Sequence, residues 1–185
     1  MLCALLGDPR GALRVHGRGL GRRALRERCR AAADDERNHA RWLSSLAERH
    51  GAFVRAPQVE ARAHDRLTIA IHNAVEGCVH EAFAALVAAV VARVGASELL
   101  RRIYARIADD EAGHGQLAWD LHEWFMSRLS PRERERVAAV NRDALARLPA
   151  RVGWLAELPG EFGSISSSDA RRLADNFVAA LGCAR

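Results

Sequence analysis

The hydrophobic positions of the chain recur at α-helical spacing over three long segments. In the first, from about residue 20 to 50, these positions are Leu25, Cys29, Ala32, Leu43 and Leu46. The second runs from about 59 to 94, and its last third is almost wholly apolar, which predicts burial on most sides. The third runs from about 98 to 129. The pattern therefore predicts three long helices that share one core.

Turn and capping residues separate these segments. Gly51 and Gly95 end the first two helices. Ser130 begins a shorter fourth helix, with Pro131 at its first position and Glu133 as the capping-box partner. Because the connections are short, each helix is expected to run antiparallel to the next. The expected fold class is all-α, an antiparallel helical bundle with three long helices and shorter C-terminal helices.

The fourth helix is expected to end near Leu148, because the pattern weakens after Pro149. One further helix is expected over 169–181. Residues 1–148 are therefore predicted to form the bundle domain, and residues 149–185 a C-terminal tail with one short helix. The length of 185 residues and the hydrophobic content of 49% suit a single domain with a real core.

The net charge of +5 does not by itself indicate a nucleic-acid partner. All 28 basic residues are arginine, a bias typical of GC-rich codon usage. The densest basic stretch, from Arg10 to Arg30, contains no Phe, Trp or Tyr on which a base could stack. A basic run of this kind is usually a solvated face, so no nucleic-acid partner is expected.

The four cysteines, Cys3, Cys29, Cys78 and Cys183, lie far apart and form no C-x-x-C pair. They indicate neither a zinc site nor a disulfide framework, and a reducing, cytoplasmic setting is the simplest interpretation. The apolar residues 1–6 are too short for a signal-peptide core. No run is expected to be long enough to span a membrane.

The most specific signal is an internal repeat. The segment 33–39 (ADDERNH) reappears 75 positions later as 108–114 (ADDEAGH), so each copy holds a Glu-x-x-His motif. One such motif arises often by chance, whereas two in matching contexts are a strong signal. The alternative is that both are solvated helix faces, or that each histidine satisfies a local carbonyl. Asp35 and Asp110, which precede the glutamates, are candidates to orient the histidines from outside.

The spacing suits a metal site. Residues three apart lie on one helix face, so Glu36 and His39 point to a common place. Glu111 and His114 do the same on the other helix. Two such helices face to face can hold a pair of cations, which need further carboxylates to neutralise them. Glu76 is the expected supplier, because it lies mid-helix among apolar residues where an unpaired carboxylate is costly.

This pattern resembles the ferritin-like superfamily of di-iron carboxylate proteins, in which two bundle helices supply Glu-x-x-His and two supply one Glu each. The segment 76–83 (EGCVHEAF), followed by Asp110-Glu111-x-x-His114 and Trp119, is similar to bacterial ferritin-like domain proteins. The resemblance covers about residues 20–129. It implies a cofactor of two iron ions, with manganese as an alternative. The implied metal ligands are Glu36, His39, Glu76, Glu111 and His114.

The chain departs from that family in one ligand. By the repeat offset, the counterpart of Glu76 falls at position 1, and neither Asp8 nor Glu27 convincingly replaces it. The first bundle helix is therefore expected to be missing from the bundle. Three explanations stay open: a start upstream, which we favour, a helix donated by another subunit, as in a homodimer, or a site with one metal. Failing the first, the helix over 131–148 is a candidate to fill the vacant corner.

Three other residues of the second long helix receive weaker interpretations. Glu81, five residues after Glu76, points about 140° away on an α-helix and is interpreted as a paired or surface carboxylate. His72 and His80 lie one turn on either side of Glu76. Either is a candidate for a supporting group or ligand, but a histidine on such a face is more often simply hydrogen-bonded.

The resemblance implies a non-haem di-iron protein that acts with dioxygen or peroxide, either as a ferroxidase or as an oxidoreductase on a substrate that the sequence does not identify. No rubredoxin-like cysteine pairs are present to make a built-in electron-transfer module. The alternative comes from another class: a helical interaction or structural module with a ferritin-like core and no working metal site. The metal content of the purified protein distinguishes the two hypotheses.

Overall fold

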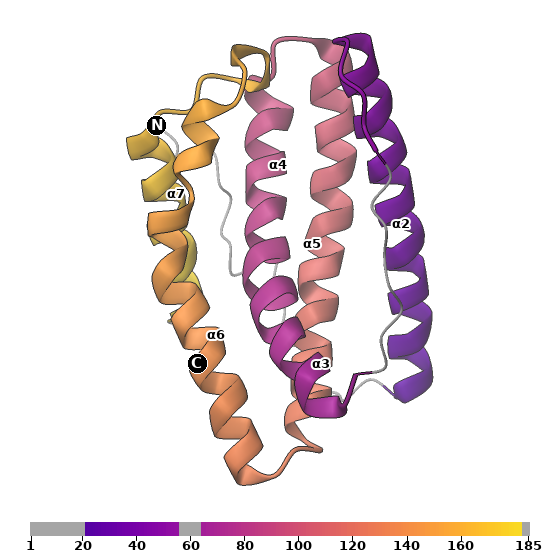
Figure 1. The fold of residues 1–185 in the computed structure, drawn as a ribbon, viewed down its shortest axis with the longest axis vertical. Helices are drawn as coiled ribbons and strands as arrows, with labels where there is room; N and C mark the ends of the chain where they lie inside the picture. Colours follow the sequence, from indigo (N-terminus) through magenta and orange to yellow (C-terminus); the bar gives the residue numbers. More distant parts are fainter. Residues whose placement is uncertain (1–20, 56–63, 183–185) are drawn as a thin grey trace.

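The computed structural model describes residues 21–55 and 64–182, and every regular element within these ranges is a helix (Figure 1). The elements are α2 (Arg22–Arg49), α3 (Arg66–His72), η2 (Asn73–Glu81), α4 (Ala82–Val94), α5 (Glu98–Met126), α6 (Pro131–Arg151), η3 (Gly153–Glu157), η4 (Gly160–Phe162) and α7 (Ser167–Gly182). The predicted all-α class is confirmed for this part of the chain. The predicted helical residues 59–63 lie outside the described ranges.

The elements α3, η2 and α4 follow one another without a break, so Arg66–Val94 is one long helix, called here the α3–α4 helix. Asp65 caps its start by accepting a hydrogen bond from the Thr68 amide at 2.7 Å. Its middle segment, η2, is a π-helix of 9 residues. The hydrophobic pattern predicts a regular α-helix throughout, because an apolar stretch contains nothing that marks a π segment.

The α3–α4 helix packs closely and antiparallel against α5. A Cβ atom added to Gly77 would lie 2.7 Å from the Cβ of Ala118, and one added to Gly115 would lie 3.3 Å from the Cβ of Ala82. The two helices therefore approach most closely where one of the facing residues has no side chain. The antiparallel prediction is confirmed for this pair.

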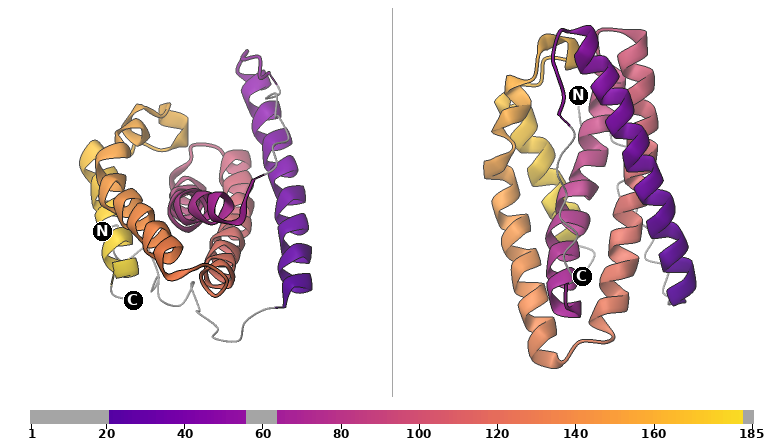
Figure 2. Two further views of the ribbon diagram at one scale, coloured as in Figure 1. Left: turned by 60° about the horizontal axis from the view of Figure 1, so that its bottom comes forward. Right: turned by 45° about the vertical axis from the view of Figure 1, so that its right-hand side comes forward.

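α2 also runs antiparallel to α5, since Arg28 forms an ion pair with Asp120 while His39, further along α2, lies 3.2 Å from Asp110. α2 and the α3–α4 helix consequently run in the same direction (Figure 2), and the expectation that they are antiparallel is wrong. The 16 residues between Arg49 and Arg66, at about 3.3 Å each when extended, can return along the length of the 28-residue α2. This connection is therefore a crossover.

α6 and α7 lie on one side of the α3–α4 helix, and α2 lies beyond α5 on the other (Figures 1 and 2). The helix predicted over 131–148 is present, but it is not beside α2. α6 continues through Pro149, which stands in its last turn. The described part of the predicted tail joins the main core, where the rings of Phe83 and Phe177 lie 5.6 Å apart between centroids.

By length and composition alone, Arg66–Val94 is apolar enough to cross a membrane, so the expectation that no run reaches that length is wrong. A single such helix is weak evidence for a membrane, because the central helix of a bundle has the same composition. In the structure this helix packs on α5 and α6.

One buried polar contact ties α6 to the π-helix. The side-chain amide of Asn141, 1% exposed, donates a hydrogen bond to the carbonyl of Ala74 at 2.6 Å. Ala74 is fully buried. Removing this donor would leave a buried carbonyl short of a partner.

Replacing Asn141 by leucine should therefore lower the free energy of unfolding by about 1–3 kcal/mol. Denaturant unfolding followed by circular dichroism would measure the change. Glu135→Ala, at an exposed position of the same helix, serves as the control and should stay within about 0.5 kcal/mol of wild type. Equal stabilities of the two variants would show that the Asn141 contact contributes nothing.

Candidate metal centre

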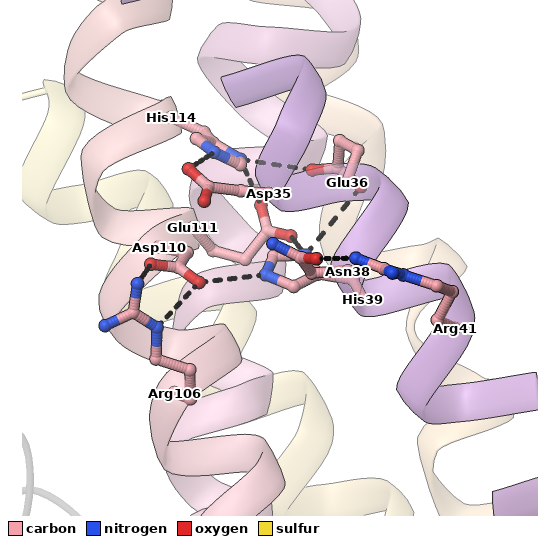
Figure 3. Close-up of polar contacts among 9 residues, drawn as sticks. All are labelled: Asp35, Glu36, Asn38, His39, Arg41, Arg106, Asp110, Glu111 and His114. Carbon is pink, nitrogen blue, oxygen red and sulfur yellow. Dashed lines mark hydrogen bonds and ion pairs between the residues drawn. The ribbon is translucent and has the colours of Figure 1, made fainter. Parts of the chain in front are cut away.

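Two glutamates and two histidines from α2 and α5 converge in the structure (Figure 3). One ligand atom from each of Glu36, His39 and Glu111 lies within 4.8 Å of the others. His114 joins this group, because its Nδ1 lies 3.1 Å from Oε1 of Glu36 and 3.5 Å from Oε2 of Glu111. Four of the five side chains predicted as ligands are thus brought together.

The four side chains are arranged with an approximate two-fold symmetry that follows the repeat. The Nδ1 of His39 lies 3.4 Å from Oε1 of Glu111 and 3.8 Å from Oε2 of Glu36. Each histidine therefore points its Nδ1 at both glutamates. The antiparallel packing of α2 on α5 produces this arrangement, since it sets the two copies of the motif face to face.

The two aspartates of the repeat bind the outer nitrogens of the histidines. Nε2 of His39 lies 3.2 Å from Oδ2 of Asp110, and Nε2 of His114 lies 3.4 Å from Oδ2 of Asp35. Each aspartate therefore serves the histidine of the opposite helix. A histidine whose Nε2–H donates to a carboxylate keeps the lone pair of Nδ1 for a metal. The arrangement thus directs both Nδ1 atoms toward the glutamates.

Burial makes this cluster costly without a cation. His39, Glu111 and His114 are buried, whereas the Glu36 side chain is 55% exposed. Oε2 of Glu111 is fully buried and accepts no hydrogen bond of good geometry in the described structure, where its ion-pair contact is with Nδ1 of His114 at 3.5 Å. A buried carboxylate oxygen without a donor is expensive, and a bound cation would offset that cost. The carboxylate and imidazole donors therefore fit a divalent transition-metal ion.

In the metal-free protein, a proton on His114 supplies the positive charge that a bound cation would provide. The Glu111 carboxylate, whose Oε2 lies 3.5 Å from Nδ1, raises the pKa of His114 to about 9. Burial works against this, and the contact with Asp35 and the charge of Glu36 add to the rise. Binding of a metal at Nδ1 must displace this proton.

Glu76, the fifth predicted ligand, is placed differently. Its Oε2 lies 2.9 Å from Nδ1 of His80, one turn further along the same helix. Within the described residues, no hydrogen bond or ion pair joins Glu76 to the four clustered side chains. His72 is exposed.

Glu81 was predicted to be a paired or surface carboxylate, not a metal ligand. The pKa of Glu81 is raised, first by desolvation and then by the carboxylates of Glu111 and Glu36. Glu81 therefore lies within electrostatic range of both glutamates. The predicted angle of about 140° between Glu76 and Glu81 assumes a regular α-helix. Both residues belong to the π-helix η2, so that angle does not apply.

Comparison of the chain with protein-family models, with curated proteins and with solved structures gives no significant match, so the centre is interpreted from its own geometry.

The raised pKa of His114 predicts a pH-dependent stability of the metal-free protein. Because the pKa is about 9 in the folded state and the ordinary value for histidine is 6.5, the charged histidine stabilises the fold fully below pH 6.5. That contribution is lost as the pH rises toward 9. The difference in melting temperature between the chelator-treated wild type and His114→Gln should shrink over this interval. Parallel melting profiles for the two proteins would contradict this origin of the shift.

Proposed function

We propose that the chain is a ferritin-like di-metal carboxylate protein, which holds a pair of iron ions between α2 and α5 and uses them with dioxygen or peroxide to oxidise iron or an organic substrate. The observation that carries the proposal is the convergence of both Glu-x-x-His motifs around a buried Glu111 carboxylate, one oxygen of which accepts no hydrogen bond of good geometry. A solvated pair of helix faces would not bury His39 and His114, so this observation favours a site over the alternative.

The topology supports the same proposal. Ferritin-like bundles contain one long crossover between helices that run in the same direction. Here α2 and the α3–α4 helix run in the same direction and are joined by such a crossover. The helix that would complete the bundle beside α2 is not among the described elements.

When bound, the iron ions would supply electrons to the oxidant, and the side chains of the chain have separate tasks. His39 and His114 would each offer Nδ1, and Glu36 and Glu111 would offer carboxylate oxygens that neutralise the charge of the ions. The aspartates hold the outer nitrogens of the histidines. The exposure of Glu36 leaves the centre open to a small oxidant on that side.

Manganese or a mixed pair stays an alternative, because these donors do not select iron by themselves. We further propose a cytoplasmic protein that works without nucleic acid or membrane. A homodimer, in which a second copy of the chain supplies the helix beside α2, also stays a proposal.

A second candidate function is a helical interaction module without a working metal site. The exposure of α2 favours it, since only Leu25 and His39 are buried among its 28 residues. A surface of this kind is available for a protein partner.

Replacing His114 by alanine tests the proposal. After anaerobic loading with ferrous iron and removal of excess, wild type should hold close to two iron ions per chain and the variant far fewer, as measured by elemental analysis. His50→Gln is the matched control, because His50 follows the end of α2 and pairs with Glu161 away from the cluster. Wild-type protein without iron, or a variant with unchanged iron, would refute the metal centre.

A further inference from the structure

We propose that Glu81 is the carboxylate that the α3–α4 helix contributes to the metal centre, in place of the Glu76 that the sequence pattern indicates. This inference rests on the proposed metal site and names a ligand within it. It is carried by the register of the α3–α4 helix against α5 and by the π-helix between the two glutamates.

The register places Glu81 beside His114. Ala82 faces Gly115 across the helix interface, so the preceding residue, Glu81, lies at the level of positions 115 and 116. Gly115 directly follows His114 in α5. Glu81 is therefore close to the height of the His114 end of the cluster.

The same register places Glu76 further from the level of the cluster. Gly77 faces Ala118, so Glu76 lies near the level of Trp119. Trp119 is five residues beyond His114, which is about 7.5 Å along an α-helix. The carboxylate of Glu76 is also already hydrogen-bonded to His80. Height and bonding both favour Glu81 over Glu76.

The π-helix corrects the direction in which Glu81 points. Residues five apart diverge by about 140° on an α-helix. In a π-helix, bonded from i to i+5 with roughly four and a half residues per turn, residues five apart lie on nearly the same face. η2 spans Asn73–Glu81 and includes both glutamates. Glu81 is therefore not turned away from the face that Glu76 was expected to occupy.

Charge also connects Glu81 to the cluster. Carboxylates from α2 and from α5, Glu36 and Glu111, act on it together with the His114 side chain. Keeping the carboxylates of Glu81, Glu36 and Glu111 within electrostatic range of one another is unfavourable unless a cation lies between them. The Glu81 residue as a whole is exposed, like Glu36, although its carboxylate is partly desolvated, so both would close the solvent-accessible side of the centre.

A cobalt titration of the whole chain distinguishes the two glutamates. Glu81→Gln and Glu76→Gln remove one charge each with little change in shape, and circular dichroism confirms that both variants fold. We expect Glu81→Gln to lower the affinity for Co²⁺ by about tenfold or more, with a change in the visible Co²⁺ absorption. Glu76→Gln should bind within about threefold of wild type, with the wild-type spectrum.

Two results would overturn the assignment. Unchanged cobalt affinity in Glu81→Gln, or an equal or larger loss in Glu76→Gln, would contradict it even if His114→Ala abolishes binding and the metal centre itself stands. Wild-type protein that binds no cobalt and no iron would instead remove the metal centre, and the assignment with it.

Discussion

The packing of α2 against α5 depends on polar contacts, namely a network of opposed histidines and carboxylates together with the Arg28–Asp120 ion pair. α2 buries only Leu25 and His39, so apolar contact contributes little to its attachment. The polar contacts of His39 with Asp110 and of His114 with Asp35 and Glu36 span the interface instead. Such a buried network is most stabilising when every member is well hydrogen-bonded, and Oε2 of Glu111 is the member that has only a long ion-pair contact.

The close packing of the other helices fixes the position of α5, which carries one half of this network. Gly77 and Gly115 allow the α3–α4 helix and α5 to approach closely, and Asn141 ties α6 to the π-helix. α5 therefore presents Glu111 and His114 from a well-packed core, whereas α2 brings its half from the edge of the bundle. A metal bound between the halves would also strengthen the attachment of α2, because ligand binding to the assembled site stabilises it.

Much of this structure is predictable from the sequence. Helical spacing and capping residues such as Ser130 locate the described helices, and the repeat identifies the four side chains that converge. The direction of α2 was not predictable from helix lengths, because it depends on the path of the chain between Arg49 and Arg66. The π-helix leaves no mark in the hydrophobic pattern, so the direction of Glu81 relative to Glu76 could not be predicted from α-helical geometry. The crosswise pairing of the aspartates required knowledge of which helices face each other.

Anomalous X-ray diffraction from crystals soaked anaerobically in ferrous iron tests the central claim most directly. Two neighbouring iron peaks are expected between α2 and α5, coordinated by Nδ1 of His39 and Nδ1 of His114 and by the carboxylates of Glu36 and Glu111. Iron bound elsewhere on the surface, or histidines that coordinate through Nε2 with their aspartate contacts broken, would contradict it.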